Sequence, residues 1–243
     1  MDIGNTTIRC AVGSVENYTQ ALMLTQDAVS TDSFTLFMDN SFGPEIWGEL
    51  RGCVLSSVVP QKNEIIAQSL SKKNSALPPI SHIDLTKSSV DFSQYNGLLG
   101  NDRAISCVAA AAKHKAPVIV IDLGTATTIN AVDASNVFLG GAITAGVQTG
   151  LTALNSLTAQ LPAVDDFTKV SLIGNDTPSC LVSGAVIGTA CMLEGYVSRI
   201  KKEISGNPTV VITGGNAPKV MPFCNFGFIY EPSLLLEGMF LLS

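Results

Sequence analysis

Apolar runs and alternating stretches divide this chain into a series of predicted strands. Residues 54–60, 118–122 and 209–213 are rich in valine, isoleucine and leucine, which is typical of buried strands. Residues 8–12 alternate in character before a turn at Gly13-Ser14, which predicts a hairpin. Residues 129–132 and 137–139 predict a second hairpin, and Gly140-Gly141 predicts a further turn.

Helical patterns separate these strands. They predict helices over residues 31–39, 62–72, 103–113, 146–160, 177–204 and 232–242, with loops at 40–44 and at 74–97, the second holding a short strand. Asn101 and Asp102 are N-cap residue types before the third helix, and Thr177 is an N-cap candidate with Pro178 at the first helical position. Strands that alternate with helices indicate an α/β fold.

One short motif occurs twice and suggests an internal duplication. Asp2-Ile3-Gly4-Asn5-Thr6-Thr7 opens the chain, and Asp122-Leu123-Gly124-Thr125-Ala126-Thr127-Thr128 begins about halfway along it. The repeat predicts two related domains, 1–112 and 113–243, with a cleft between them. The second copy follows four apolar residues, whereas the first follows only Met1, so we expect the strand before the first turn to be short or to continue upstream.

Composition narrows the class of protein. A formal charge of −6 and a sequence pI near 4.8 argue against nucleic-acid binding, which needs a basic surface. The chain has six cysteines but no Cys-x-x-Cys pair. We therefore expect the cysteines to be buried as small apolar residues of a protein in a reducing compartment, and not to form disulfides or bind zinc. No basic leader precedes an apolar segment, and glycines or charges interrupt the uncharged stretches, so we expect a cytoplasmic protein with no membrane span.

The residue types in the repeated turn suit phosphate and metal binding. Glycine lets a backbone turn approach a ligand closely, and N–H and hydroxyl groups can hold phosphate oxygens. A carboxylate at the same turn suits Mg²⁺, which binds one or two carboxylates together with phosphates and water. The structural alternatives are a tight N-terminal turn for the first copy and an Asp at a strand end for the second.

Gly100-Asn101-Asp102-Arg103 has a similar ambiguity. A capping residue at a helix start explains Asp102 without any function. Arg103 favours a second reading, because a cation in the first helical turn is opposed by the helix dipole and should have an anionic partner. A guanidinium can bind a substrate carboxylate through two hydrogen bonds.

Eight motifs in order carry a family resemblance over nearly the whole chain. They are the two Asp-Gly turns, residues 56–60, 100–103, 140–143, 158–162 and 174–177, and Thr213-Gly214-Gly215. The series resembles the type III pantothenate kinases, within the actin–Hsp70–sugar-kinase (ASKHA) superfamily. Two departures concern the substrate pocket: Ala145 stands where the family usually has proline, and the aromatic residue expected before the 100–103 loop is displaced, with Phe92 and Tyr95 nearby.

The resemblance implies a fold and a reaction. The fold would be two ribonuclease H-like domains around a nucleotide cleft. The reaction would be ATP-dependent phosphorylation of pantothenate to 4′-phosphopantothenate, the first step of coenzyme A biosynthesis. The cofactors implied are ATP, Mg²⁺ and a monovalent cation, K⁺ or NH₄⁺. A homodimer is also implied, with residues 178–204 either its interface or part of the core.

The same resemblance assigns roles to individual residues. Asp102 would be the catalytic base, and Asp122 would bind the monovalent cation. Nucleotide contacts would come from Asp2, Ile3, Gly4, Asn5, Thr6, Thr7, Ile8, Arg9 and Thr125, with Asp2 holding hydrated Mg²⁺. Substrate contacts would come from Gly100, Asn101, Asp102, Arg103 and Thr177. Gly214-Gly215 would either pass close to adenine or simply end a strand.

Two rival functions fit parts of the pattern. A sugar kinase of the same fold would keep both turns, but a neutral sugar offers Arg103 no carboxylate. A regulatory relative without activity would keep the fold, but the retention of Asp2, Asp102, Arg103 and Asp122 argues against lost catalysis.

Overall fold

The computed structural model describes residues 1–14 and 16–243, and they form two compact units. Unit 1 comprises Met1–Ser88, Gly100–Ile105 and Leu235–Ser243, and unit 2 comprises Ser89–Leu99 and Ser106–Leu234. Each unit contains a mixed five-stranded sheet with helices, so the predicted α/β class is confirmed. The predicted domains, 1–112 and 113–243, were drawn from the sequence repeat, and their boundary stays a prediction.

Unit 1 is built on a sheet in the order β3-β2-β1-β4-β5. Its strands are β1 (Asp2–Ile3), β2 (Thr7–Gly13), β3 (Tyr18–Leu24), β4 (Val54–Ser57) and β5 (Ser81–His82), and its helices include α1 (Thr31–Phe42), α2 (Ile46–Glu49), α3 (Pro60–Lys73) and most of α8 (Leu234–Leu241). The predicted first hairpin is confirmed by the antiparallel pairing of β2 and β3. Ile3, Ile8 and Leu55 from the sheet pack with Phe34 of α1 and Ile66 of α3 in one core.

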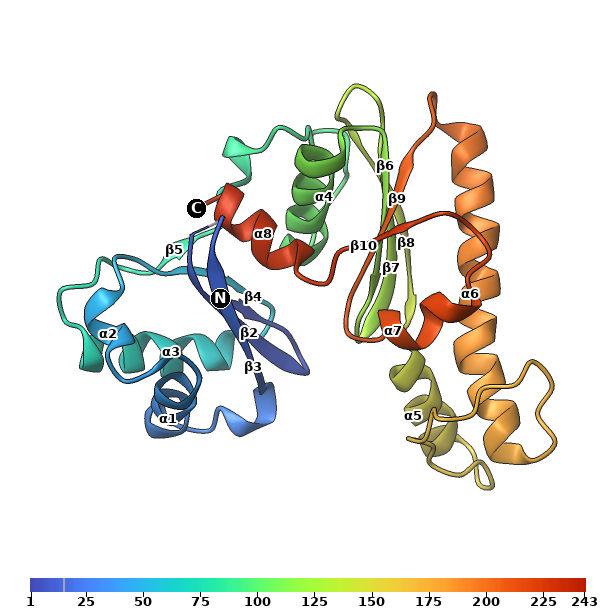
Figure 1. The fold of residues 1–243 in the computed structure, drawn as a ribbon, viewed down its shortest axis with the longest axis horizontal. Coiled ribbons are helices and arrows are strands. Elements are labelled where there is room, and N and C mark those ends of the chain that lie inside the picture. Colours follow the sequence, from blue (N-terminus) through green and yellow to red (C-terminus); the bar gives the residue numbers. More distant parts are fainter. Residues whose placement is uncertain (15) are drawn as a thin grey trace. The chain divides into compact units, whose positions relative to one another are not determined.

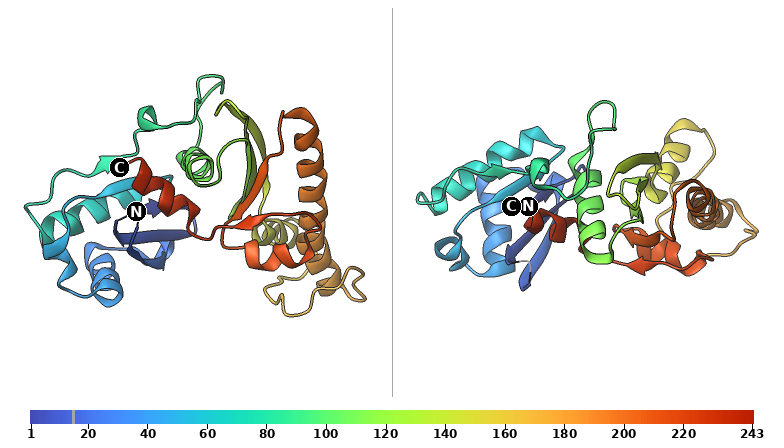
Figure 2. Two further views of the ribbon diagram at one scale, coloured as in Figure 1. Left: turned by 45° about the horizontal axis from the view of Figure 1, so that its top comes forward. Right: turned by 90° about the horizontal axis from the view of Figure 1, so that it is seen from above.

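Unit 2 is built on a sheet in the order β10-β9-β6-β7-β8. Its strands are β6 (Val118–Leu123), β7 (Ala126–Val132), β8 (Phe138–Ala145), β9 (Thr209–Thr213) and β10 (Ile229–Tyr230), and its helices include α5 (Val147–Leu157), α6 (Thr177–Glu203), α7 (Ala217–Val220) and most of α4 (Asn101–His114). Helices α4 and α6 lie on opposite faces of this sheet (Figures 1 and 2). That coverage explains why residues 118–121 of β6 are apolar and fully buried.

The predicted turn at Gly140-Gly141 is wrong, because both glycines lie within β8. The pairing of β7 with β8 shifts register there: Ala131 faces Gly140, but Val132 faces Phe138. Gly140 has φ +98°, and a methyl group on Gly141 would lie 1.7 Å from the Ile129 carbonyl oxygen. The glycines therefore allow a bulge and a close strand approach, which a sequence pattern does not distinguish from a turn.

Two helix starts also differ from the predictions. Asn101 and Asp102 are inside the first turn of α4 rather than before it. At α6 the N-cap is Asp176, not Thr177: the Asp176 carboxylate accepts a bond from the Ser179 N–H, and the Ser179 hydroxyl oxygen accepts one from the Asp176 N–H. This reciprocal capping pair fixes the helix start one residue earlier than the Thr-Pro signal indicates.

Two other boundaries moved for simple reasons. Strand β4 ends at Ser57, and Pro60 begins α3 instead of ending the strand, a position at which the absent N–H costs nothing. Helix α1 continues to Phe42, so only the end of the predicted 40–44 loop is outside it. The predicted strand at 137–139 is much longer in the structure, where β8 continues to Ala145. The other predicted strands and helices are present with small shifts at their ends.

Helix α6 has the length and apolar composition of a membrane span, with a mean hydropathy of 1.5. One such helix is weak evidence, because a core helix meets the same criteria. Val182, Val186, Ala190, Leu193 and Val197 form a buried stripe on α6 against the sheet of unit 2. The stripe follows helical spacing, so this face belongs to the core of the unit.

The cysteines are only partly as predicted. All six are free; Cys10 and Cys107 are buried as expected, whereas Cys180 and Cys191 are exposed on α6. Burial raises the pKa of the Cys10 thiol to about 12, which keeps it protonated and unreactive.

Candidate active site

The first Asp-Gly turn joins β1 to β2 and is closed by backbone hydrogen bonds. The Gly4 N–H donates to the Thr7 carbonyl at 2.9 Å. Thr25, buried after β3, holds the same turn twice: its N–H donates to the Thr6 carbonyl at 2.9 Å, and its hydroxyl donates to the Gly4 carbonyl at 2.7 Å. Asn5 and Thr6 remain exposed at the tip of the turn. The turn is thus pre-formed and presents polar groups to solvent.

Residues 2–9 do not all offer side chains to a ligand. Ile3 and Ile8 are fully buried in the core of unit 1, so only their backbone could contact a nucleotide. The exposed part of the segment is the turn itself. The structure therefore divides the predicted nucleotide segment into a supporting strand pair and an accessible tip.

Asp2 is a buried carboxylate with little compensation for its charge. It is 7% exposed, its carboxylate oxygen lies 3.7 Å from an Arg9 nitrogen, and it accepts a hydrogen bond from Ser56 on the neighbouring strand. Burial, and to a smaller extent the negative charge of Asp102, raise its pKa to about 6 against the opposing effect of Arg9. A cation at this carboxylate would restore the ionised form.

Asp102 lies in the first turn of α4, within the part of the helix that belongs to unit 1. Its carboxylate accepts a bond from the Arg103 N–H at 2.9 Å and folds back over Gly100, where a methyl group would be 2.6 Å from the carboxylate oxygen. Gly100 is therefore needed for the position of Asp102. The electrostatic effect of Asp102 on Asp2 shows that the fold brings these two predicted site residues near each other.

Arg103 follows Asp102 but is buried, with 8% of its surface exposed. A buried guanidinium is stable only beside anionic or hydrogen-bonding partners. Asp2, Asp102 and Arg103 all belong to unit 1, so the predicted catalytic carboxylate, Asp102, lies in that unit.

The second turn, between β6 and β7, lies in unit 2 and is held by three other segments. Gly146 N–H and the Thr149 hydroxyl donate to the Thr125 carbonyl at 3.0 and 2.7 Å. The Asn216 side-chain amide donates to the Gly124 carbonyl at 3.0 Å, and its N–H donates to the Leu123 carbonyl at 2.8 Å. Asn216 thereby links the turn to the Gly214-Gly215 segment after β9.

Gly214 is required by the approach of that segment to Asp122. It has φ +98°, and a methyl group there would lie 2.4 Å from an Asp122 carboxylate oxygen and 2.5 Å from the Leu123 nitrogen. Gly215 has open space around it. Gly214 therefore follows the end of β9, as one of the two predictions had it, and it also packs closely against the Asp122 carboxylate.

The oxygen atoms of this turn decide where a cation could bind. The Thr125 carbonyl already accepts two hydrogen bonds. The other oxygen ligands of the type that cations bind are the carboxylate of half-buried Asp122 and the hydroxyl of exposed Thr125. No group of three or more His, Cys, Asp or Glu side chains among residues 1–14 and 16–243 could hold a metal. Lone carboxylates such as Asp2 and Asp122 still fit cations that take their other ligands from phosphates and water.

Thr177 is exposed in the first turn of α6. It belongs to unit 2 with Asp122 and Thr125, whereas Asp2, Gly100, Asn101, Asp102 and Arg103 belong to unit 1. Sequence reasoning did not identify Thr25 or Asn216, and it gave Ser56 no role. The bonds of Thr25, Asn216 and Ser56 join segments far apart in the chain, so no local pattern marks them.

Comparison with known proteins identifies the family. The model of the type III pantothenate kinase family matches residues 1–199. The chain belongs to the type III pantothenate kinase family. The type III pantothenate kinase of Listeria monocytogenes is 30% identical over 246 residues, covering 100% of this chain and 95% of that protein. The enzyme of Rhodococcus jostii is 41% identical over 145 residues, covering 58% of this chain and 54% of that protein.

Solved structures agree on the fold. A conserved Baf family protein from Campylobacter jejuni has a TM-score of 0.60 at 19% identity, over 98% of this chain and 93% of that one. The ethanolamine utilization protein EutJ from Carboxydothermus hydrogenoformans has a TM-score of 0.53 at 14% identity, over 100% and 88%. These likenesses concern the fold alone. Together with family membership, they confirm the predicted ASKHA fold. Family membership alone confirms a pantothenate kinase as the kind of enzyme.

Proposed function

We propose that the protein transfers the γ-phosphoryl group of ATP to the primary hydroxyl of pantothenate, with Asp102 as the base and Asp2 as the ligand of hydrated Mg²⁺. Family membership supports the reaction. The observation that supports the residues is the raised pKa of Asp2, to which burial contributes most and the negative charge of Asp102 contributes less, because a buried carboxylate with a perturbed pKa beside another carboxylate is typical of functional sites. The products are ADP and 4′-phosphopantothenate, which begins coenzyme A biosynthesis.

The proposed chemistry is mainly positioning and charge compensation. The hydroxyl oxygen bonds to the γ-phosphorus while the bond to the β,γ-bridging oxygen breaks, and ADP leaves with that electron pair. Asp102 orients the hydroxyl and accepts its proton late, since a loose transition state requires little early deprotonation. Mg²⁺ would neutralise phosphate charge when bound.

The nucleotide and substrate contacts are assigned to separate segments. Backbone N–H groups and Thr6 and Thr7 of the first turn are assigned to the phosphates, and Thr125 is assigned to the nucleotide. Gly100–Arg103 and Thr177 are assigned to pantothenate, with the Arg103 guanidinium pairing with its carboxylate. Arg103 follows Asp102 directly in the first turn of α4, and a guanidinium can hold a carboxylate through two hydrogen bonds.

Asp122 is proposed as the ligand of a monovalent cation, K⁺ or NH₄⁺. Its carboxylate is held by the packing of Gly214 against it, and the nearby Thr125 side chain adds an oxygen donor. Such a cation would offset the negative charge of Asp122 beside a polyphosphate.

A steady-state assay that measures ADP directly, by chromatographic separation from ATP, tests the proposed reaction without a coupling enzyme that needs K⁺ itself. We expect turnover with pantothenate that falls by at least about ten-fold when K⁺ is replaced by a large organic cation such as tetramethylammonium, and no turnover with hexoses. Turnover with hexoses but not pantothenate would contradict the substrate, and equal rates without K⁺ or NH₄⁺ would contradict the cation.

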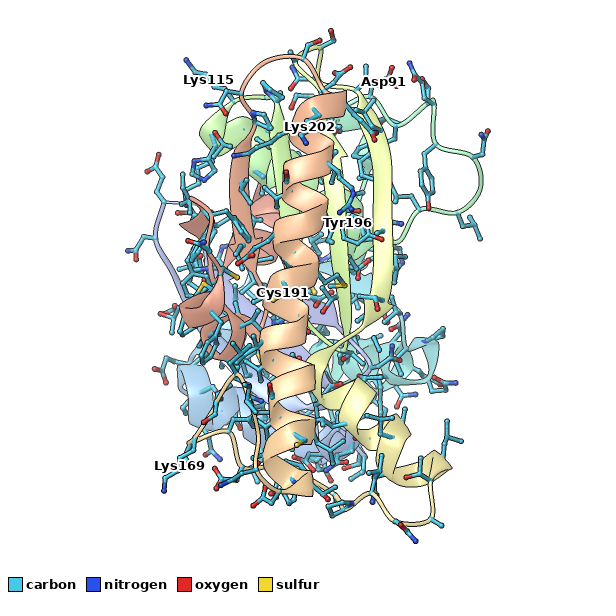
Figure 3. The ribbon with its side chains drawn as sticks, turned by 90° about the vertical axis from the view of Figure 1, so that its right-hand side faces the viewer. Asp91, Lys115, Lys169, Cys191, Tyr196 and Lys202 are labelled. Carbon is cyan, nitrogen blue, oxygen red and sulfur yellow. The ribbon has the colours of Figure 1, made fainter. Side chains whose placement is uncertain are left out.

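We also propose a cytoplasmic homodimer joined through the outer face of α6. Figure 3 looks onto this face, where Cys191 and Tyr196 are labelled and no helix or strand of the described chain lies in front of α6. Gly184 and Gly188 on it have open space around their Cα atoms, and Ile143 of the edge strand β8 is 60% exposed. Small residues allow a second helix to approach closely, and the exposed apolar groups would be buried by it.

Sedimentation equilibrium tests the dimer. We expect the wild-type protein to have twice the chain mass and Gly188→Arg to have the mass of one chain, because the arginine side chain would occupy the proposed interface. Gly227→Arg, at another position with open space, serves as the control and should remain dimeric. Equal masses for the wild type and Gly188→Arg would exclude this interface.

A further inference from the structure

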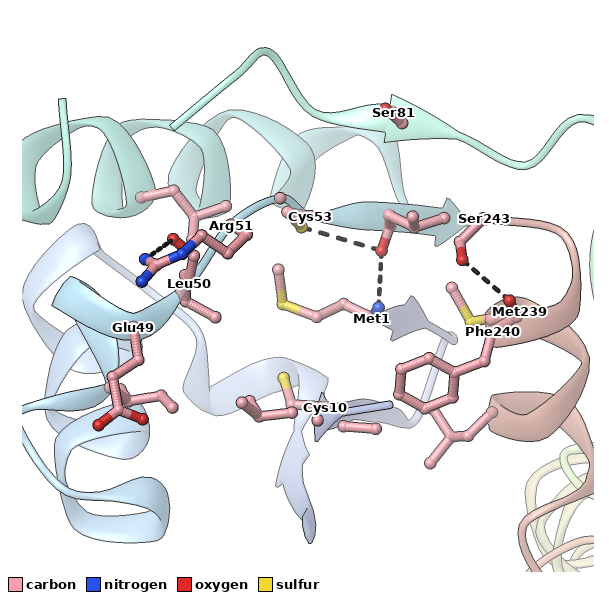
Figure 4. A pocket seen from close by; sticks show the side chains of 18 of the residues that line it. Met1, Cys10, Glu49, Leu50, Arg51, Cys53, Ser81, Met239, Phe240 and Ser243 are labelled. Atoms are coloured by element: carbon pink, nitrogen blue, oxygen red, sulfur yellow. Dashed lines mark hydrogen bonds between the residues drawn. The ribbon is translucent and has the colours of Figure 1, made fainter. Parts of the chain in front are cut away.

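The second Asp-Gly turn, in unit 2, is supported by side chains that have no place in the proposed chemistry. A cavity of about 580 Å³ in unit 1, beside Met1 (Figure 4), is lined by none of the residues assigned to ATP, pantothenate or a cation. The second turn, in contrast, carries two of those residues. Three side chains in contact with one another, Asn216, Lys219 and Phe167, lead from this turn to the core of unit 2.

Asn216 supports the turn in only one orientation of its side-chain amide. Its Nδ2 donates to the Gly124 carbonyl at 3.0 Å, and its backbone N–H donates to the Leu123 carbonyl at 2.8 Å. If the amide were rotated by half a turn, the acceptor Oδ1 would face the Gly124 carbonyl oxygen, which is also an acceptor. The support of the turn therefore depends on what holds Oδ1 on its other side.

The ammonium group of Lys219 holds Oδ1. Lys219 Nζ lies 3.2 Å from Asn216 Oδ1. An ammonium group has three donors and no acceptor, so it is compatible only with the orientation in which Oδ1 faces it and Nδ2 faces Gly124. The backbone brings the two residues together, because α7 begins directly after Asn216 and the Lys219 N–H donates to the Asn216 carbonyl at 3.0 Å.

Phe167 keeps the Lys219 side chain in this position. The centroid of its ring is 4.1 Å from Lys219 Nζ, which is within the range of a cation–π interaction. A half-buried lysine that folds back toward its own helix start loses rotamer freedom. None of the ion pairs among residues 1–14 and 16–243 includes Lys219. The aromatic ring is therefore the contact that offsets this loss.

Phe167 is itself held by the core. It lies in the segment between α5 and α6, which contains no helix or strand, and it packs against the hydrophobic core of unit 2. Three residues earlier, Val164 is buried, and its carbonyl accepts a hydrogen bond from the Gln148 side chain at 3.1 Å. The ring is thus a fixed platform for the lysine.

We propose that Lys219 is a positioning residue for the second Asp-Gly turn. It orients the Asn216 amide and, through that amide, the Gly124 carbonyl and the turn that carries Asp122 and Thr125. Lys219 contacts no substrate in this role. The functional consequence rests on the proposed function, in which Asp122 binds the monovalent cation and Thr125 contacts the nucleotide.

Hydrogen exchange of the Gly124 N–H, followed by NMR in the ligand-free protein, tests this role independently of the reaction. The N–H donates to the Ala126 carbonyl within the turn. We expect Lys219→Met, which keeps an unbranched side chain but removes the charge and the donors, to speed its exchange about ten-fold. Lys169→Met is the matched control: Lys169 is an exposed lysine of the segment that holds Phe167, and its variant should exchange like the wild type.

The Asn216→Ala background shows whether Lys219 acts through Asn216. In that background we expect Lys219→Met to change the exchange of the Gly124 N–H by less than about two-fold, because the amide that the lysine orients is gone. In the steady-state assay, Lys219→Met alone should raise KM for ATP and the K⁺ concentration that gives half-maximal rate by about three- to ten-fold. Its KM for pantothenate should stay within about two-fold of the wild type.

Three results would overturn the proposal. The first is unchanged exchange of the Gly124 N–H in Lys219→Met. The second is an equal increase at the N–H of Val120, in the buried strand β6, which would indicate a general loss of stability. The third is a ten-fold effect of Lys219→Met that persists in the Asn216→Ala background, because Lys219 would then act on the turn directly.

The kinetic result separates this proposal from the proposed function. Faster exchange of the Gly124 N–H with unchanged KM for ATP and unchanged K⁺ dependence would support the positioning of the turn by Lys219 and contradict the roles of Asp122 and Thr125. A wild-type protein that does not turn over pantothenate would contradict the proposed function, and the exchange measurement would still decide the role of Lys219.

Discussion

The Asp102→Asn variant is expected to lose about 10²- to 10⁴-fold in kcat with pantothenate, while its Kd for pantothenate changes by less than about three-fold. Asparagine has the same shape, and its carbonyl oxygen can still accept the Arg103 N–H bond that the carboxylate accepts at 2.9 Å. It cannot accept the proton of the substrate hydroxyl. Direct measurement of ADP gives kcat, and isothermal titration calorimetry measures pantothenate binding.

Asp32→Asn is the matched control for this variant. Asp32 also lies in the first turn of a helix, α1, and forms an exposed ion pair with Lys72 at 3.3 Å. If Asp102 served only as an acidic residue at a helix start, both variants would lose a similar, small amount of stability and keep their kcat. An Asp102→Asn enzyme with more than a tenth of the wild-type kcat would therefore reject the assignment of the base.

The fold could be predicted where local chemistry and tertiary structure agree. Residues 118–121 are apolar without interruption because both faces of β6 are covered, and that coverage makes the strand visible in the sequence. Helix α6 was visible for a similar reason: one stripe of small and branched residues packs on the sheet. The Asp-Gly repeat added the relation between the two sheets, which no single element indicates.

Predictions failed where a residue type has two uses. Glycine at 140 and 141 serves a bulge and a close strand contact, although the same dipeptide is typical of turns. Thr177-Pro178 is a valid helix start, but Asp176 and Ser179 form a reciprocal cap that sets the boundary. In both places the outcome depends on the neighbouring strand or on two competing caps, and these are not properties of one residue.

The sequence allowed the carboxylates of the candidate site to be proposed, but not the residues that hold its turns in place. Asp2 and Asp122 could be proposed because a carboxylate beside glycine and hydroxyl residues suits phosphate and metal binding, and Asp102 could be proposed because of the family resemblance of residues 100–103. Thr25 and Asn216 could not, because their role is to hold a distant turn through side-chain and backbone bonds. The raised pKa of Asp2 was equally invisible, since it results from burial and from Asp102, which is a hundred residues away.

The Asp2→Asn variant is expected to be inactive yet more stable than the wild type at pH 8. If Asp2 is the ligand of Mg²⁺, the substitution should lower kcat by at least about 10²-fold, because the charge compensation of the phosphates is lost. The stability gain follows from burial: Asp2 has a pKa of about 6 in the folded protein against an ordinary value of 3.8. Function and stability therefore oppose each other at this residue.

The effect of Asp2 on the free energy of unfolding changes with pH because the folded and unfolded states bind protons differently. Between pH 4 and pH 6 the folded protein holds a proton on Asp2 that the unfolded chain has lost, so Asp2 lowers stability progressively as pH rises through this range. Above pH 6 the loss of stability is complete. The difference between a pKa of about 6 and the ordinary value of 3.8, at 1.36 kcal/mol per pKa unit, makes it about 3 kcal/mol. Asparagine has no such loss, although Arg9 loses its partner. We expect a net gain of about 1–3 kcal/mol at pH 8 and little gain at pH 4.

Urea denaturation of the metal-free, nucleotide-free protein at pH 4, 6 and 8 measures this difference, with Asp32→Asn as the control. The control carboxylate is largely exposed, so its variant should follow the wild-type pH profile at every point. A stability gain of Asp2→Asn that is equal at all three pH values would attribute the effect to packing and not to ionisation. A loss of stability at pH 8 would mean that the Ser56 and Arg9 contacts of Asp2 outweigh its burial, and the uncompensated carboxylate would no longer support a cation at this site.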